Sequence, residues 1–248
     1  MRIALISDIH EDIQYLNRAL KRIEKKGADL IICLGDISGF SIPHYKYSDL
    51  RNAHECLLIL REKCDIILPG NHDFHAGRII PQSSEIFNFP DNWYDLDYRK
   101  KFNLANDSIW LHEENDLDPL YTPGDIEFLR SLPEYHVLET EKLNILLSHY
   151  VYPNLSGFKK GFYTSPGDFI EHFHFMNKLS CQISFTGHAH VKGFYMVSKS
   201  YFGHYKRKRL EKNNSPLCIG IPPVTRNNNR SGFCIFDVER LFVQTFSC

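Results

Sequence analysis

The sequence lacks an excess of charge of either sign. Its 248 residues include 29 Lys and Arg against 30 Asp and Glu, with a formal net charge of -1 and a pI near 6.9. Proteins that bind nucleic acid or anionic membrane surfaces usually carry a basic excess. The charge balance therefore argues against stable nucleic-acid or membrane binding and favours small or compact substrates.

Long hydrophobic runs are also missing. No stretch approaches the roughly 18 apolar residues that a membrane-spanning helix needs. The N-terminal strand-like run reaches Asp8 too soon for the apolar region of a signal peptide. We therefore expect a soluble, cytoplasmic protein. Because 43% hydrophobic residues can build one sizeable core, we also expect residues 1–248 to form a single domain.

Paired cysteine spacings are absent as well. The seven cysteines show none of the short spacings that zinc ribbons or disulfide scaffolds require. Cys33, Cys181, Cys218 and Cys234 lie in apolar, strand-like runs, where cysteine behaves as a small hydrophobic residue. We expect reduced core thiols rather than redox chemistry.

From Met1 to about Leu68 the pattern alternates strand and helix, which predicts a parallel sheet flanked by helices. Apolar spacing predicts a helix over Ile13–Lys25 that Gly27 ends, and a second over Asp49–Lys63. Between residues 74 and 120 the periodicity is weak and aromatics are dense, which favours irregular structure and short helices.

Two Ser/Thr-Pro pairs predict the later helices. Thr122 should cap a helix that runs to about Leu132, and Ser165 one that runs to about Leu179. The remaining apolar runs predict strands and a second sheet, with a hairpin turn at 237–240 and a surface loop at 227–229. The predicted strands cover 135–140, 143–147, 182–186, 194–198, 216–221, 233–238 and 241–246.

Polar side chains capable of binding metal follow five of the predicted strands. Imidazole, carboxylate and amide oxygen together suit borderline divalent metals. Because Asp36 stands between two glycines at a strand end, it could be shared by two ions, and dinuclear sites of this kind hydrolyse phosphate esters. The candidate ligands are Asp8, His10, Asp36, Asn71, His149, His188 and His190.

These residues give the chain a resemblance to the calcineurin-like metallophosphoesterases. The blocks Asp-x-His, Gly-Asp-x-x-Gly, Gly-Asn-His-Asp, a lone His and Gly-His-x-His occur in the family's order, and the tail 220–226 followed by Gly232-Phe233 extends the likeness to nearly the whole chain. The chain looks most similar to small prokaryotic diadenosine tetraphosphatase-like and phosphodiesterase-like enzymes. The resemblance implies an α/β fold in which two mixed sheets form an αββα sandwich.

The resemblance also implies how the ligands divide. One metal, Mn²⁺ or an Fe/Zn ion, would take Asp8, His10, Asp36 and His190. The other would take Asp36, Asn71, His149 and His188. The two ions would share Asp36 and an attacking hydroxide. His72 would face the scissile phosphate without binding metal, and Asp73 would orient His72 and favour its protonated form.

Two departures from the family pattern bear on the substrate. The chain has Gly39-Phe40-Ser41-Ile42-Pro43 and His149-Tyr150 where relatives usually have Gly-Tyr-Gly-Pro and a glycine after the histidine. We expect Tyr150 and the aromatic loop 40–47 to line the mouth of the pocket, where Tyr150 could stack on a nucleotide base or simply pack the loop. Arg226, in the tail, is a further candidate for substrate contact.

The reaction that follows is hydrolysis of a phosphodiester or phosphomonoester of small or nucleotide-like type. A serine/threonine-type protein phosphatase is the enzymatic alternative, disfavoured by the short chain and by Asp73, where those enzymes usually have glutamate. A catalytically silent scaffold with this fold is the alternative outside enzymes, disfavoured by the complete ligand set. The basic run 205–209 is expected to be a solvated hairpin rather than a site for a polyanion. The sequence names neither the physiological substrate nor the oligomeric state.

Overall fold

The computed structural model describes residues 1–82, 86–211, 216–226 and 230–248, so the loop expected at 227–229 lies outside the described residues. The N-terminal helix is confirmed, and it ends where Gly27 adopts a positive φ of 69°. The second helix begins later than expected, because Asn52 caps it by accepting a hydrogen bond from the Glu55 backbone N–H. The helices are α1 (Ile13–Lys26), α2 (Ala53–Lys63), α3 (Asn71–Gly77), α4 (Tyr98–Ala105), α5 (Pro123–Ser131) and α6 (Ile170–Lys178), with 3-10 turns at Ser48–Leu50, Trp93–Asp95 and Pro166–Phe169.

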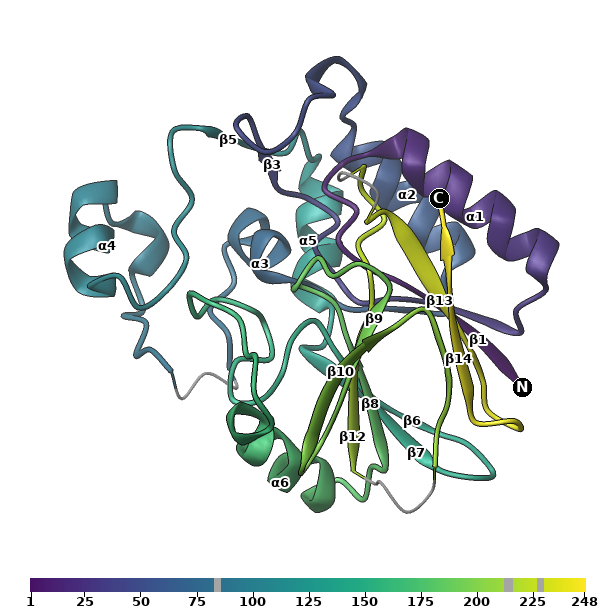
Figure 1. Ribbon diagram of the computed structural model, residues 1–248. Coiled ribbons are helices and arrows are strands. Elements are labelled where there is room, and N and C mark those ends of the chain that lie inside the picture. Colours follow the sequence, from purple (N-terminus) through teal and green to yellow (C-terminus); the bar gives the residue numbers. More distant parts are fainter. Residues whose placement is uncertain (83–85, 212–215, 227–229) are drawn as a thin grey trace.

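Two large mixed sheets form the centre of the molecule (Figure 1). The first has the order β11 (Arg207–Arg209), β14 (Phe242–Ser247), β13 (Gly232–Asp237), β1 (Arg2–Ile6), β2 (Leu30–Cys33) and β4 (Ile66–Ile67). The second has the order β10 (Tyr201–Tyr205), β9 (Phe194–Ser198), β12 (Leu217–Gly220), β8 (Ile183–Thr186), β7 (Asn144–Ser148) and β6 (Tyr135–Glu139). A two-stranded ribbon joins β3 (Phe40–Ser41) and β5 (Asp116–Leu117).

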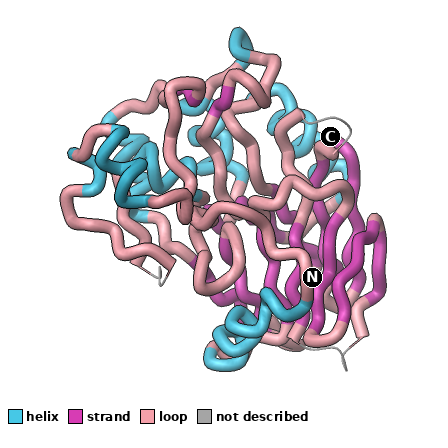
Figure 2. Tube along the Cα trace, turned by 60° about the vertical axis from the view of Figure 1, so that its left-hand side comes forward, coloured by secondary structure: helices cyan, strands magenta, loops and turns pink. Residues whose placement is uncertain are grey.

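The alternation of side chains along each strand builds four layers. In β1, Ile3 and Leu5 face the core between the sheets, whereas Ala4 and Ile6 face α1 and α2 on the outside. In β7, Leu146 faces α6 on the outer face of the second sheet. The helices therefore cover both outer faces (Figures 1 and 2), and the expected αββα sandwich is confirmed.

Aromatic side chains from α3, from the segment before α4 and from the loop after β7 pack as a separate cluster. Phe74, Phe89, Trp93 and Phe158 are buried together there, beside the short helix α4. The irregular structure and short helices expected between residues 74 and 120 are confirmed. This cluster lies along one side of the strand ends that carry the candidate ligands.

The basic run 205–209 does not form the expected hairpin. Tyr205 ends β10 in the second sheet, and Arg207 begins β11 in the first, so the chain crosses between the two sheets at Lys206. Both strands were missed in the sequence. Among the described residues, no helix has the length and apolar character required to cross a membrane.

Candidate metal centre

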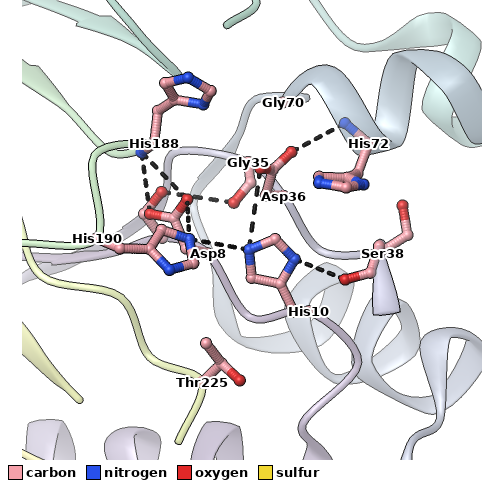
Figure 3. A network of polar contacts seen from close by, with 12 residues as sticks. Asp8, His10, Gly35, Asp36, Ser38, Gly70, His72, His188, His190 and Thr225 are labelled. Carbon is pink, nitrogen blue, oxygen red and sulfur yellow. Dashed lines mark hydrogen bonds and ion pairs between the residues drawn. The ribbon is translucent and has the colours of Figure 1, made fainter. Parts of the chain in front are cut away.

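All seven candidate ligands come together at one end of the sandwich. Parallel strands β1 and β2 of the first sheet and β7 and β8 of the second end here, and each is followed by ligand-bearing loops. Asn71 begins α3, directly after β4. Figure 3 shows Asp8, His10 and His190 on one side of the site, with Asp36 between them and His72.

The ligand loops have an unusual backbone. Asp8, His10, Asp36, His188 and His190 all have positive φ angles, between 47° and 66°. Side chains other than glycine rarely adopt this left-handed conformation, and such strain gathers at functional sites. The fold therefore holds these five residues in a costly conformation that turns their side chains toward one another.

Asp36 occupies the middle of the centre. Its Oδ2 lies 3.2 Å from Nε2 of His149 and 4.0 Å from Nε2 of His10. Its Oδ1 accepts a hydrogen bond from the backbone N–H of His72 at 3.0 Å. Gly70 makes the approach possible, since a Cβ there would lie 2.2 Å from Asp36 Oδ1.

Backbone carbonyls orient two of the imidazoles. Nδ1 of His10 lies 2.7 Å from the Gly39 carbonyl, and Nδ1 of His149 lies 2.8 Å from the Leu34 carbonyl. Each Nδ1–H therefore donates to a carbonyl and leaves the lone pair of Nε2 directed into the centre, which is the arrangement common for metal-bound histidine. Nε2 of His10 then lies only 3.0 Å from Nε2 of His190, a spacing suited to a cation between them.

The donor set also contains an unsatisfied oxygen. Oδ1 of Asn71 is buried and has no hydrogen-bond partner among the described residues. Such an orphaned acceptor is costly unless a cation or water satisfies it. Together with the facing imidazoles, it shows that the residues fit divalent metal ions. The compact groups are Asp8, His10 and His190, then Asp36, His149 and His188, and also His10, Asp36 and His72, with ligand atoms within 4.8 Å of one another in each group.

Electrostatics in the metal-free chain favour charged carboxylates. Burial opposes ionisation of Asp8, but the neighbouring imidazoles of His190 and His149 together outweigh burial and lower the pKa of Asp8 to about 2. Burial likewise disfavours a charged His149, but Asp36 raises the pKa of that imidazole to about 9. A metal bound at His149 would therefore replace a proton.

Asp73 does not have the position expected for it. Its carboxylate accepts hydrogen bonds from the backbone N–H groups of Ile37, Ser38 and Gly70 and from the Ser38 hydroxyl, at 2.7 to 3.1 Å. It thus fixes the loop that carries Asp36. The expectation that Asp73 orients His72 is wrong, because α3 begins here and Asp73 turns back to cap its own helix.

In the chain alone, without ions or ester, burial disfavours a protonated His72. Burial lowers the pKa of His72 to about 3, and nearby Asp36 offsets only part of that effect. The ring packs against Trp110 at 4.3 Å and lies 5.2 Å from the His10 ring. Gly39 allows this position, since a Cβ there would lie 2.2 Å from the His72 ring.

Tyr150 and Arg226 do not line the cavity that opens onto the metal centre. Tyr150 is 1% exposed, its ring packs 4.6 Å from the His188 ring, and its hydroxyl accepts a hydrogen bond from the Tyr163 backbone N–H. Arg226 forms two side-chain hydrogen bonds with Asp12, at 2.7 and 2.8 Å. The predicted stacking role of Tyr150 is therefore wrong. The Arg226 guanidinium binds Asp12, the residue that caps α1, instead of contacting the cavity.

A cavity of about 760 Å³ opens onto the centre. The loop 40–47 contributes to it as expected through Pro43, His44, Tyr45 and Lys46, but Phe40 and Tyr47 are buried in the loop's own core. Sequence reasoning missed the rest of the wall. The residues missed include Trp110, Gly157, Lys159, Lys160, Gly161, Phe162 and Arg230.

The missed wall did carry a sequence signal. Gly157 and Gly161 bracket Phe158-Lys159-Lys160 shortly after the His149 block. Both glycines have positive φ, and a Cβ at Gly157 would lie 2.7 Å from Nδ1 of His188. A glycine-bracketed basic pair so close to a ligand block indicates a loop that approaches the site closely.

Known proteins share both the sequence pattern and the fold. An uncharacterized protein from Methanocaldococcus jannaschii is 25% identical over 239 residues, which cover 95% of this chain and 82% of that relative. A metallophosphoesterase from Sphaerobacter thermophilus has the same fold, with a TM-score of 0.64, 18% identity, and coverage of 100% of this chain and 88% of that one. A hypothetical protein from Pyrococcus horikoshii OT3 gives a TM-score of 0.60 at 13% identity, covering 99% and 87%.

The family match adds the chemistry that fold similarity alone does not give. Residues 1–192 match the model of the calcineurin-like phosphoesterases, and this range contains every candidate metal ligand. That family is metal-dependent, in agreement with the unsatisfied Asn71 and the facing imidazoles. The chain belongs to the calcineurin-like phosphoesterase family.

Proposed function

We propose that the protein is a dinuclear, metal-dependent phosphoesterase that hydrolyses phosphodiesters or phosphomonoesters of nucleotide-like substrates. The position of Asp36 is the observation that carries this proposal. Its carboxylate lies between the imidazoles of His10 and His149. The Nε2 atoms of both rings face Asp36, and the two residues belong to different ligand groups. Two divalent ions held there would activate a water molecule for in-line attack and neutralise charge on the phosphoryl oxygens.

The chain's own residues position the ester. Asp73 holds the loop that carries Asp36, while the carbonyls of Gly39 and Leu34 fix the imidazoles of His10 and His149. The His72 imidazole lines the cavity beside these ligands, where it can hydrogen-bond the phosphoryl or leaving-group oxygen.

The cavity wall supports an anionic substrate that carries a flat ring. Lys46, Lys159, Lys160 and Arg230 are exposed along its rim and attract negative charge. Phe162 is 56% exposed, although its ring lies 5.5 Å from that of the candidate ligand His188. A large aromatic left open beside a phosphoesterase centre is suited to stacking on a nucleobase.

Metal content and activity together test the proposal. Metal-stripped protein should regain hydrolysis when Mn²⁺ is added, and the assay should compare bis-p-nitrophenyl phosphate, p-nitrophenyl phosphate, cyclic nucleotides, dinucleoside polyphosphates and a phosphoserine peptide. Preferred hydrolysis of the peptide would favour the protein-phosphatase alternative. No hydrolysis of any ester by fully metallated protein would favour the silent scaffold.

Asp36→Asn tests the shared ligand directly. The amide neither carries the charge nor bridges two ions well, so the variant should lose both metals and essentially all turnover. Elemental analysis of the folded variant provides the measurement, and Asp91→Asn, at an exposed aspartate, is the matched control. Two tightly held ions in folded Asp36→Asn protein would refute the bridging assignment.

A further inference from the structure

A second group of potential metal ligands lies outside the main centre. It consists of His75 in α3, His112 in the loop before β5, and Asp118 just after β5. One ligand atom from each lies within 4.8 Å of the other two. The rings of His75 and His112 are stacked 4.3 Å apart at an angle of 9°, and His112 Nε2 lies 3.3 Å from Asp118 Oδ1. Because the lone pairs of two stacked rings run parallel, one ring must rotate out of the stack before both nitrogens can donate to one ion.

The chemistry of this group selects the class of ion. Burial lowers the pKa of His75 to about 3, so its ring is neutral at physiological pH and has a lone pair to donate. Two imidazoles and one carboxylate suit Zn²⁺, Co²⁺, Ni²⁺ or Cu²⁺ rather than Mg²⁺ or Ca²⁺, which prefer sets made entirely of oxygen. Asp118 is exposed and can follow the ion, since 84% of its side-chain surface is accessible.

Two nearby cationic side chains also disfavour binding of a hard ion such as Mg²⁺ or Ca²⁺, which would be held mainly by electrostatic attraction. Arg78 and Lys101 line the adjacent cavity of about 380 Å³ with His75 and Asp118. The Arg78 guanidinium is paired with Asp95, and the Lys101 ammonium lies over the rings of Trp93 and Tyr94. An ion must therefore be held by donation from imidazole nitrogen, which transition ions accept strongly.

We propose that His75, His112 and Asp118 form a second metal site that binds one divalent transition ion such as Zn²⁺. The ion would join α3, whose first residues are Asn71 and His72, to the segment that carries Trp110. The Trp110 ring lies 4.3 Å from that of His72, 5.8 Å from that of His75 and 6.3 Å from that of His112. The site is thus placed to hold the Trp110 wall of the main cavity against α3.

Stoichiometry of Zn²⁺ binding to metal-stripped protein tests this site. Calorimetric titration should show that His112→Gln and Asp118→Asn each bind about one equivalent of Zn²⁺ fewer than the unmodified chain, since each variant lacks one of the three protein ligands. His174→Gln removes an exposed imidazole of α6 that belongs to none of these ligand groups, and it should bind as many ions as the unmodified chain.

The Asp36→Asn variant separates this inference from the proposed function. With the main centre lost, the chain should still bind about one Co²⁺ with the visible absorption of a low-coordinate site, and adding His112→Gln should abolish that spectrum. Equal Zn²⁺ stoichiometry for His112→Gln and the unmodified chain, or no Co²⁺ spectrum in Asp36→Asn, would overturn the site and leave the stacked imidazoles as packing.

Discussion

The imidazole of His72 lies at the boundary between metal binding and catalysis. One of its ring nitrogens lies within 4.8 Å of ligand atoms of His10 and Asp36. Its backbone N–H already donates to Asp36, and its ring packs on Trp110 at the cavity wall. Such a position suits a side chain that contacts the ester while neighbouring residues bind the ions.

His72→Asn should retain both metals yet lose roughly 10²- to 10⁴-fold in turnover, the range for a positioned acid or charge stabiliser. The loss should grow with the basicity of the leaving alcohol, because a proton donor matters least for a stable anion. Turnover on a series of aryl and alkyl esters measures this. An equal loss across the series would leave charge stabilisation as the only role, and loss of metal would make His72 a ligand.

Phe162 provides a test of substrate choice at a single residue. If its exposed ring stacks on a base, Phe162→Ala should raise KM for a nucleotide substrate about tenfold, because stacking contributes about 1 to 3 kcal/mol. KM for a small aryl phosphodiester should change little. Phe102→Ala is the matched control, since that ring is 52% exposed on α4, away from the cavity. Equal changes in KM for both esters would exclude base stacking.

The sequence predicted which residues could bind metal better than it predicted where neighbouring side chains point. The ligand candidates follow from polar groups at strand ends, and the structure gathers all seven. Tyr150 was assigned wrongly because β7 ends at Ser148 and the chain then bends, so the direction of the next side chains cannot be derived from strand alternation. The His149 imidazole faces the centre, whereas Tyr150 is buried with Phe169 and Phe173 behind the His188 ring.

At the scale of elements, α6 contacts the second sheet through a buried histidine. Nδ1 of His172 accepts a hydrogen bond from the Tyr152 backbone N–H at 3.0 Å, and its Nε2–H can donate to the Ser184 hydroxyl at 2.8 Å. Burial lowers the pKa of His172 from 6.5 to about 3. The folded chain therefore keeps this ring neutral at pH values where the unfolded chain protonates it.

This difference predicts a pH dependence of stability. Between pH 6.5 and pH 3 the unfolded chain binds the extra proton, so the contribution of His172 is present above pH 6.5 and is lost as the pH falls. Metal-free unmodified protein should lose unfolding free energy more steeply than His172→Gln in this range, by at most about 1.4 kcal/mol per pH unit. Denaturant unfolding at several pH values measures this.

His174→Gln is the control on the same helix, because His174 is exposed. Its stability should follow the pH curve of the unmodified chain. Parallel curves for His172→Gln and the unmodified chain would contradict the buried neutral state of His172.

Sequence signals predicted the elements that have clear ends. Thr122 caps α5 as expected, with Pro123 in its first turn. β10 and β11 were missed because Tyr201–Tyr205 contains a glycine and no strict alternation, and β11 consists of three cations. Their strand conformation comes from pairing and not from local propensity: β10 pairs with the preceding strand β9, and β11 pairs with β14, which is remote in the chain.

At the scale of the whole molecule, the candidate ligands come from both sheets. Asp8, His10 and Asp36 follow strands of the first sheet, while His149 and His188 follow strands of the second. Bound ions would therefore tie the two halves of the sandwich together at this end. Without them, two buried acidic groups lie close together in the centre, where burial and the nearby Asp36 both raise the pKa of Asp8 and the imidazoles of His190 and His149 lower it.

Metal removal should therefore lower thermal stability. A site filled to 100 to 1,000 times its dissociation constant contributes about 3 to 4 kcal/mol, or a fall in Tm of roughly 5 to 15 °C on removal for a chain of this size. Scanning calorimetry of chelator-treated and Mn²⁺-reloaded protein measures it. An unchanged Tm, with metal content verified in both samples, would show that the ions do not link the sheets.

The family pattern predicted the architecture, whereas the places of Trp110 and Phe162 in the cavity wall could not be predicted. Strand order depends on contacts between distant segments, such as β1 between β2 and β13, and the motif blocks specify those only through the resemblance. Trp110 and Phe162 lie in loops with no regular period, so their places follow from tertiary packing, such as that against His72 and His188.

The crossing at Lys206 leaves β11 as an outer strand of the first sheet, and its three residues are Arg207, Lys208 and Arg209. An outer strand presents unpaired backbone groups that can recruit a strand from another molecule and begin aggregation. Two such edges meeting would bring six cations together. The charge of the basic run therefore disfavours the growth of an intermolecular β-sheet from this edge.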